Sequence, residues 1–159
     1  MKRGIVVILF WLLLCTPASA QEIVGPARVI DGDTIEIAGT RIRLYGIDAP
    51  EWYQICFGPN AQPWRCGRDS AWALRDLTKG HAVRCPELFG LDRYRRTLAV
   101  CFVGSVEINR AMVESGMAWA YRKYSKRYVE IEERAKARKT GVWGGPIPNT
   151  TPEDVRKGR

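Results

Sequence analysis

The run "ARVIDGDTIEIAGTRIRLYGI" (residues 27–47) constrains the fold more than any other part of the sequence. Apolar and polar residues alternate in three short segments, which is typical of half-buried β-strands. These segments are residues 29–30, 34–37 and 41–47. Glycine-containing turn sequences at 31–33 and 38–40 separate them. The pattern predicts a β-meander, which ends at Pro50 because proline has no N–H to donate to a sheet.

Further elements are predicted downstream of the meander. Residues 52–67 hold two prolines, two glycines and no regular period, which favours a long loop. The periodicity predicts helices and strands over 68–80 (helix), 81–85 (strand), 97–103 (strand), 107–116 (helix) and 125–141 (helix). This order matches the oligonucleotide-binding (OB) barrel. The predicted class is α+β, mainly β: a five-stranded OB-fold Greek-key barrel with three helices.

The first 20 residues have the features of an export signal. Lys2 and Arg3 form a basic start, residues 4–14 are almost wholly apolar, and residues 18–20 are small. This pattern predicts a secretory signal peptide over 1–20, cleaved after Ala20, and therefore a periplasmic or secreted protein. An uncleaved N-terminal anchor is the alternative.

Cleavage after Ala20 removes 20 of the 159 residues and leaves 139, the usual size of one domain. We expect that domain over 21–143. The tail, residues 144–159, has little apolar content and is expected to be disordered. No later segment reaches membrane-spanning length, so no stable membrane association is expected after cleavage. Nothing in the sequence demands more than a monomer.

The charge of the chain points to an acidic partner. The sequence has 25 Lys and Arg against 17 Asp and Glu, and the signal removes two basic residues and no acid, which leaves +6. A basic, exported domain fits a polyanion such as nucleic acid, an acidic polysaccharide or an anionic membrane surface. Charge alone does not choose among these.

Four cysteines remain after cleavage: Cys56, Cys66, Cys85 and Cys101. An even number in an exported protein favours disulfides, and four cysteines allow three connectivities. The pairing Cys56–Cys66 would close a short loop, and Cys85–Cys101 would join the two strands of a hairpin; we prefer this pairing. No C-x-x-C spacing occurs and His81 is the single histidine, which argues against structural zinc.

Two acids lie at strand ends of the meander. Asp33 is in the first turn and Asp48 follows the third strand, so the meander could bring them together. Neighbouring carboxylates repel unless a cation lies between them. Without histidine or free cysteine, the ligands would be oxygens, which favours Ca²⁺ or Mg²⁺. Alternatively, Asp33 is simply a turn residue.

Arginines accompany these acids. Arg43 is an odd number of residues from Asp48, so strand alternation places the two on opposite faces unless the strand end twists. The segment "DRYRRTLA" (residues 92–99) holds three arginines, whose planar forks suit phosphate oxygens. A surface arginine and a solvated basic turn are the alternatives.

Aromatic side chains near the last helix could stack on nucleobases. They are Trp119, Tyr121 and Tyr124. For Trp119, packing in the core is an equally good interpretation.

The segments "VIDGDTIEI", "RIRLYGIDAPE", "DRYRRTLA" and "INRAMVESGMAWAY" occur in the order and approximate spacing of the staphylococcal nuclease (thermonuclease) family. The chain resembles that family over residues 27–143, and "DGDT" followed by the "RLYGIDAPE" pattern is specific in combination. The resemblance implies an OB barrel with helices that hydrolyses DNA and RNA phosphodiesters with Ca²⁺.

The resemblance also implies roles for individual residues. Asp33 and Asp48 match carboxylate ligands of calcium, and Ala49 matches a position that offers its backbone carbonyl. Glu51 matches the acid that positions or deprotonates the attacking water. Arg43 and Arg96 match the two catalytic arginines that bind the scissile phosphate, and Tyr121 resembles a tyrosine that lines the nucleotide pocket. Arg93, Tyr94 and Arg95, from the arginine-rich segment, are further candidates for substrate binding.

Two departures from the family pattern are visible. Arg95 stands where glycine is usual, and the 52–67 loop carries a cysteine pair that the founding member lacks.

The expected function is a Ca²⁺-dependent nuclease that cleaves DNA and RNA by in-line attack of water, with single-stranded or locally melted substrates favoured. The alternative is a noncatalytic nucleic-acid-binding OB module.

Overall fold

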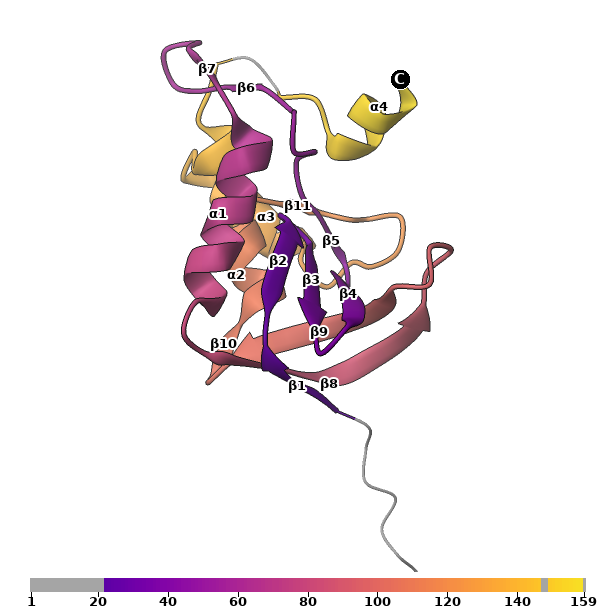
Figure 1. The fold of residues 1–159 in the computed structure, drawn as a ribbon. Helices are drawn as coiled ribbons and strands as arrows, with labels where there is room; N and C mark the ends of the chain where they lie inside the picture. The colour runs from indigo at the N-terminus through magenta and orange to yellow at the C-terminus, as the bar shows by residue number, and fades with distance from the viewer. Residues whose placement is uncertain (1–21, 147–148, 159) are drawn as a thin grey trace, which may run out of the picture.

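The predicted meander is present in the computed structural model, which describes residues 22–146 and 149–158 (Figure 1). The predicted signal peptide therefore lies outside the described residues. The meander consists of three antiparallel neighbours: β2 (Arg28–Asp31), β3 (Thr34–Ile37) and β4 (Thr40–Leu44). Their inward positions are apolar, as the alternation predicts, so the meander forms one wall of the core.

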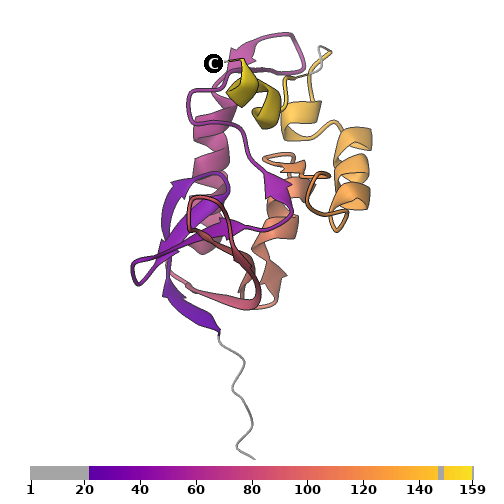
Figure 2. The ribbon, with the colours of Figure 1, turned by 90° about the vertical axis from the view of Figure 1, so that its right-hand side faces the viewer.

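The meander belongs to a larger sheet that curls into a half-barrel (Figures 1 and 2). The added strands are β1 (Ile23–Pro26), β8 (Ala82–Leu91), β9 (Thr97–Val103) and β10 (Val106–Glu107). The order is β1-β8-β9-β4-β3-β2, β10 pairs with β9, and β4 and β9 pair in parallel. This arrangement confirms the predicted α+β, mainly β, OB-like class.

The three predicted helices are present with shifted ends. They are α1 (Cys66–Thr78), α2 (Ile108–Glu114) and α3 (Val129–Ala137). The third is shorter than the predicted 125–141 at both ends. At its start, the Ser125 hydroxyl accepts a hydrogen bond from the Arg127 N–H and holds a turn. A 3₁₀ turn, η1 (Gly141–Trp143), follows. Among the described residues, no helix is long and apolar enough to cross a membrane.

The structure differs from the sequence interpretation in three segments. The loop at 52–67 contains a small hairpin, β6 (Cys56–Phe57) with β7 (Pro63–Trp64). Strand β8 continues through 86–91, which was expected to be a connection. The tail was expected to be disordered, but residues 149–158 carry a further helix, α4 (Pro152–Lys157). Polar contacts rather than apolar burial hold this helix, so hydrophobic patterning could not indicate it.

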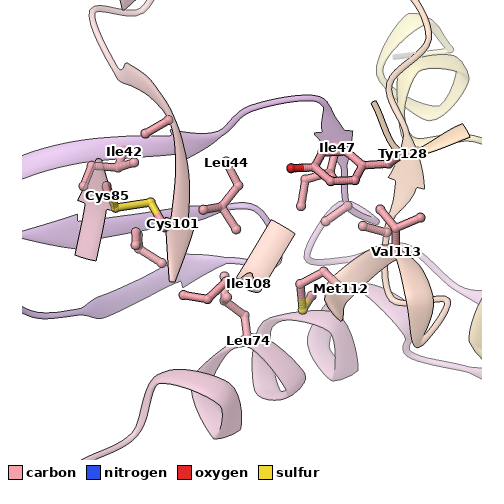
Figure 3. Packing of buried hydrophobic residues seen from close by; sticks show 14 of the residues in the cluster. Ile42, Leu44, Ile47, Leu74, Cys85, Cys101, Ile108, Met112, Val113 and Tyr128 are labelled. Carbon is pink, nitrogen blue, oxygen red and sulfur yellow. A yellow bond between two sulfur atoms is a disulfide. The ribbon is translucent and has the colours of Figure 1, made fainter. Parts of the chain in front are cut away.

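The core lies between the curled sheet and the first three helices (Figure 3). Leu74 of α1, together with Ile108 and Met112 of α2, faces Ile42 and Leu44 of the meander, and all five side chains are buried. Burial of each such side chain contributes about 1.5–3 kcal/mol. The helices thus fix the curvature of the sheet on which the acids and arginines are placed.

Both preferred disulfides are present. Cys56–Cys66 ties the β6–β7 hairpin to the start of α1, and Cys85–Cys101 joins β8 to β9 within the core. Trp119 packs against the Cys56–Cys66 disulfide and against Val142. The structure therefore supports a core-packing role for Trp119.

A buried amide links three elements near the end of β4. The Asn109 side chain donates hydrogen bonds to the carbonyls of Tyr45 (3.0 Å) and Ala99 (3.1 Å) and accepts one from the Cys101 N–H (3.1 Å). Because the amide is wholly buried and uses both its ends, it fixes where the chain leaves β4.

Candidate active site

The two predicted acids come together at one end of the meander. Asp33 lies in the turn between β2 and β3, and Asp48 ends β5 (Ile47–Asp48). The N–H of Ala49 donates a hydrogen bond to Asp33 Oδ2 at 2.9 Å, which ties the two segments directly. Both carboxylates are buried, with 6% and 2% of the residue exposed. Neighbouring buried carboxylates stay ionised only when positive partners offset their charges.

Arg43 supplies the first positive partner. Its Nη2 donates to Asp48 Oδ1 at 2.8 Å, and its Nη1 forms an ion pair with Asp33. Strand alternation alone would separate Arg43 from Asp48, but the chain turns at Gly46. Gly46 has a φ of +78°, and a Cβ there would lie 3.0 Å from the ring of Tyr128. This glycine therefore permits the turn that returns Asp48 to Arg43.

Burial shifts the pKa values of this cluster. Burial raises the pKa of the Asp31 carboxyl above its ordinary value, although the charge of Arg43 acts in the opposite direction. Burial also lowers the pKa of Arg43, while Asp48 opposes that shift and the like charge of Arg96 adds to it. The cluster thus concentrates three acids and two guanidinium groups in a region of low solvent access.

Arg96 is held in place by its own network. Asp92 Oδ2 accepts from Arg96 Nε at 2.7 Å, and Asp92 Oδ1 accepts from the Arg96 N–H at 2.9 Å. Arg96 Nη1 donates to the Thr34 hydroxyl at 3.2 Å, and that hydroxyl donates to Asp33 Oδ1 at 3.0 Å. Arg96 is therefore connected to the acid pair through Thr34.

Glu51 is positioned by its backbone contacts. Its N–H donates to the side chain of Gln54 at 3.1 Å, and its carbonyl accepts from the Gln54 N–H at 2.7 Å. The first turn of α1 packs against the Glu51 carbonyl so closely that a Cβ on Gly67 would lie 1.7 Å from that oxygen. The segment after Pro50 is thus fixed, and the Glu51 side chain remains partly exposed.

A residue from the tail completes the cluster. Arg156 of α4 donates from Nη1 to Glu51 Oε1 at 2.7 Å and from Nη2 to Asp48 Oδ2 at 2.8 Å. Burial acts to lower the pKa of Arg156, but the hydrogen bonds to Asp48 and Glu51 outweigh it and raise the pKa above the ordinary value. Both oxygens of Asp48 are thus bound by guanidinium groups.

These residues line or underlie one cleft of about 780 Å³. Neither Asp48, which pairs with Arg43, nor Arg95 is among the described residues that line the cleft. Arg95 instead sits at the tip of the β8–β9 turn with a φ of +62°. The predicted residues that line the cleft are Asp33, Arg43, Ala49, Glu51, Arg93, Tyr94, Arg96 and Tyr121.

Aromatic side chains occupy the open side of the cleft. Tyr94 is 63% exposed, and the guanidinium groups of Arg93 and Arg96 lie 4.7 and 5.4 Å from its ring centre. Tyr121 contacts Tyr124 edge to face, with 4.8 Å between the ring centres. Burial raises the pKa of the Tyr121 hydroxyl, and the negative charge of Asp48 adds to this shift. Exposed rings beside cationic groups suit the flat faces and charged backbone of single-stranded nucleic acid.

The sequence interpretation missed four residues of the cluster. Asp31 was visible as the first acid of the "DGD" turn, and Thr34 follows that turn directly, so both could have been included. Asp92 precedes the arginine-rich segment and could have been read as its partner. Arg156 gave no signal, because its contacts join positions 105 and 108 residues apart.

The donor set fits a hard cation. Asp33 and Asp48 are buried carboxylates that now pair with guanidinium groups, and the backbone carbonyl of Ala49 follows Asp48 directly in the chain. All of these donors are oxygens. Within residues 22–146 and 149–158, however, no group of three acidic, histidine or cysteine side chains is arranged to hold a metal ion. A cation held by Asp33, Asp48 and the Ala49 carbonyl would therefore need further oxygen ligands, from a phosphate or from water.

Fold and cleft together define a class of protein: a small OB-like barrel whose paired acids and arginines suit the chemistry of phosphate esters.

Comparison with known sequences narrows this class. The family model described as "Staphylococcal nuclease homologue" matches residues 41–145. Micrococcal nuclease of Shigella flexneri is 36% identical over 152 residues, covering 85% of this chain and 81% of its own length. Succinoglycan biosynthesis protein ExoI of Rhizobium meliloti (strain 1021) is 41% identical over 145 residues, with 89% and 75% covered. An uncharacterized endonuclease of Haemophilus influenzae is 37% identical over 128 residues, with 76% and 66% covered.

The chain therefore belongs to the staphylococcal nuclease family. The family and these relatives make it a hydrolase of the nuclease type.

Proposed function

We propose that this nuclease is exported and hydrolyses phosphodiester bonds of DNA and RNA in a Ca²⁺-dependent reaction, by in-line attack of water. The observation that carries the proposal is the convergence of Asp33, Glu51, Arg43 and Arg96 on one cleft, with Asp48 bound directly to Arg43. Two disulfides are compatible with export, and the expected signal peptide over 1–20 would provide it.

Calcium is the proposed cofactor because the proposed ligands are hard oxygen donors. Asp33 and Asp48 would bind it through their carboxylates and Ala49 through its carbonyl. When bound, the cation polarises a phosphate oxygen and offsets the negative charge that develops during attack.

Glu51 is the proposed general base or water-orienting group. Its carboxylate is partly exposed to the cleft, while its backbone is fixed by Gln54 and by the first turn of α1. An ionised carboxylate within hydrogen-bond reach of water can accept its proton as the oxygen approaches phosphorus.

Arg43 and Arg96 are the proposed phosphate-binding groups. Both line the cleft, and both are held from behind by carboxylates, Arg43 by Asp48 and Arg96 by Asp92. Guanidinium groups fixed in this way stabilise the additional charge on the phosphate oxygens in the transition state. Arg93, Tyr94, Arg95 and Tyr121 are proposed to bind the flanking nucleotides of single-stranded or locally melted substrate.

The experiment compares the mature protein with its Glu51→Gln variant on single- and double-stranded DNA and on RNA, with Ca²⁺ or with a chelator. We expect calcium-dependent fragmentation by the wild type and a loss of turnover of about 10²- to 10⁴-fold in the variant. Glu36→Gln is the matched control, because Glu36 lies on β3 and pairs with Arg28 outside the cleft.

The same experiment separates the proposal from a noncatalytic nucleic-acid-binding module. Retention of DNA without cleavage, unchanged by the chelator, would support the binding module. Cleavage by Glu51→Gln at the wild-type rate would refute the role of Glu51. A single species at monomer mass in sedimentation is expected for the purified protein.

A further inference from the structure

The C-terminal helix α4 is too short to be stable by itself. It has six residues, and isolated helices below roughly 12–15 residues are marginal in water. It begins at Thr151, whose hydroxyl accepts a hydrogen bond from the Asp154 N–H at 3.3 Å. Most of its residues are exposed or only partly buried. Contacts with the rest of the molecule must therefore hold it where it is.

A polar clamp holds the chain just before α4. The Asn149 side chain accepts from the Phe57 N–H at 2.7 Å and donates to the carbonyls of Phe57 and Val142 at 3.1 and 2.6 Å. Gln54, which binds the Glu51 backbone, also donates to the Thr150 carbonyl at 2.8 Å. The clamp thus attaches the tail to the segment that carries Glu51.

At its other end α4 places Arg156 on the site acids. One guanidinium bridges Glu51 Oε1 and Asp48 Oδ2, at 2.7 and 2.8 Å. Arg43 already holds the other oxygen of Asp48. A divalent cation that binds Asp48 must therefore share it with two guanidinium groups, and like charges at such distances repel.

The neighbouring charges favour departure of Arg156 from Asp48 and Glu51 when a cation binds there. Lys123, Glu153 and Lys157 also line the cleft. Both lysines pair with Glu153, so this acid does not offer Arg156 an unpaired partner. Arg156 is held by ion pairs and not by apolar packing, and its side chain is 35% exposed. The pair with Glu51 is partly exposed and costs little to break, whereas Asp48 is buried and can release Arg156 only when another cation takes over its charge.

We propose that α4 is an autoinhibitory strap: without a divalent cation Arg156 occupies Asp48 and Glu51, and cation binding at Asp33 and Asp48 frees the strap from the cleft. The proposal rests on the cation site of the proposed function. In the strapped state the guanidinium of Arg156 binds Oε1 of Glu51, and its positive charge makes this carboxylate a weaker acceptor of a proton from water. The cation would therefore have two effects: it assists the reaction, and its binding opens the site.

The first test measures binding of Ca²⁺ alone to the mature protein by titration calorimetry. Arg156→Gln is expected to bind Ca²⁺ about fivefold to tenfold more tightly than the wild type, because one competing charge is removed. Lys157→Gln is the matched control: it removes the same charge from the same helix, but Lys157 pairs with Glu153 at 3.1 Å and Asp154 at 3.8 Å. An affinity change of equal size in both variants would overturn the strap.

The second test needs no variant. Amide hydrogen exchange of the intact wild-type protein is measured with Ca²⁺ and with a chelator, and it is followed in the peptide that contains residues 149–158. Exchange of this peptide is expected to be faster with Ca²⁺, while a peptide covering β9 stays unchanged. Equal or slower exchange with Ca²⁺ overturns the strap.

These outcomes separate the two proposals. If the wild type cleaves DNA with Ca²⁺ but neither affinity nor exchange changes as expected, the strap is wrong and the proposed function stands. If the wild type neither binds Ca²⁺ nor cleaves, the proposed function fails, and the strap fails with it.

Discussion

At the scale of single residues, Arg95 is the clearest case of a side chain in a demanding backbone position. Its φ of +62° lies in the left-handed region, where a side chain costs about 1–2 kcal/mol relative to the right-handed region. The Asp92 carbonyl accepts a hydrogen bond from the Arg95 N–H at 2.9 Å and keeps the turn closed. The family pattern places glycine here, and the observed conformation gives the physical reason.

Replacing Arg95 with glycine should therefore stabilise the fold. Arg95→Gly is expected to raise the free energy of unfolding by about 0.5–1 kcal/mol, after the greater flexibility of glycine in the unfolded chain is subtracted. Urea unfolding measures this. Arg95→Ala is the control, because it removes the charge and keeps the strained conformation; a gain of the same size in Arg95→Ala would contradict the explanation.

A second prediction concerns the pH dependence of stability. Burial acts to raise the pKa of Asp92, but hydrogen bonds from the Arg96 backbone and guanidinium outweigh it and hold the pKa below its ordinary value. Because the folded pKa is below the unfolded one, the carboxylate stabilises the fold above about pH 4, and this contribution is lost as the pH falls through the folded pKa.

Asp92→Asn should consequently cost about 1 kcal/mol of unfolding free energy near neutral pH. The difference from the wild type should shrink as the pH falls from about 5 to about 2. A series of urea unfolding curves across that range measures it. A difference that stays constant with pH would show that the ionised form contributes nothing.

The candidate site was largely predictable residue by residue, because turn and strand-end motifs are local. The approach of Asp33 to Asp48 followed from the meander alone, since the first and third strands flank the second. The contact of Arg43 with Asp48 did not, because it depends on the turn at Gly46, which breaks strand alternation. Arg156 could not be predicted, because nothing local in a basic tail indicates a partner so distant in sequence.

At the scale of elements, α3 supports the site from behind through a buried acid. Glu132 has no exposed surface, and its Oε1 accepts from the N–H of Ala120 at 2.9 Å. Ala120 lies on β11 (Trp119–Ala120), which pairs with β5 and places Trp119 opposite Asp48. Glu132 is therefore a positioning residue for the strand that carries Asp48.

Removing this acid should loosen β11. Glu132→Ala is expected to lower the free energy of unfolding by about 2–4 kcal/mol, because it leaves a buried N–H unpaired and a cavity. Glu132→Gln keeps an acceptor of the same size and should lose clearly less. Thermal or urea unfolding measures both, and equal losses would assign the effect to the ion pairs with Arg122 and Lys136 instead.

Elements with strong periodicity were predicted well, and those held by polar contacts were not. The meander and α1 follow their apolar patterns, and the β8–β9 hairpin was correctly joined by Cys85–Cys101. Helix α4 has little apolar surface to bury, so its position depends on the polar contacts of Asn149 and Arg156. A hydrophobicity pattern does not predict such contacts.

At the scale of the whole molecule, basic side chains gathered on one cleft make binding of nucleic acid depend on salt. For a single-stranded oligonucleotide in chelator, each phosphate neutralised contributes about −0.7 to the slope of log affinity against log salt. Arg93→Gln is expected to make the slope shallower by about that amount, as measured by fluorescence anisotropy.

The control for this measurement is Arg28→Gln. Arg28 lies on β2, pairs with Glu36 at 2.9 Å and is not among the described residues that line the cleft. An equal change of slope in both variants would mean that net charge, and not the cleft, governs binding.

The parallel pairing of β4 with β9 has a consequence for the order in which the molecule is made. Ile42 lies beside Thr97, 55 residues later in the chain, and this pairing brings Arg43 to the same region as Arg96. Contacts between distant parts of a chain form late, because a long loop must close first. A chain synthesised only as far as β8 thus holds Asp33, Asp48 and Arg43 but lacks Arg96. The cleft therefore acquires both Arg43 and Arg96 only when β9 has paired with β4.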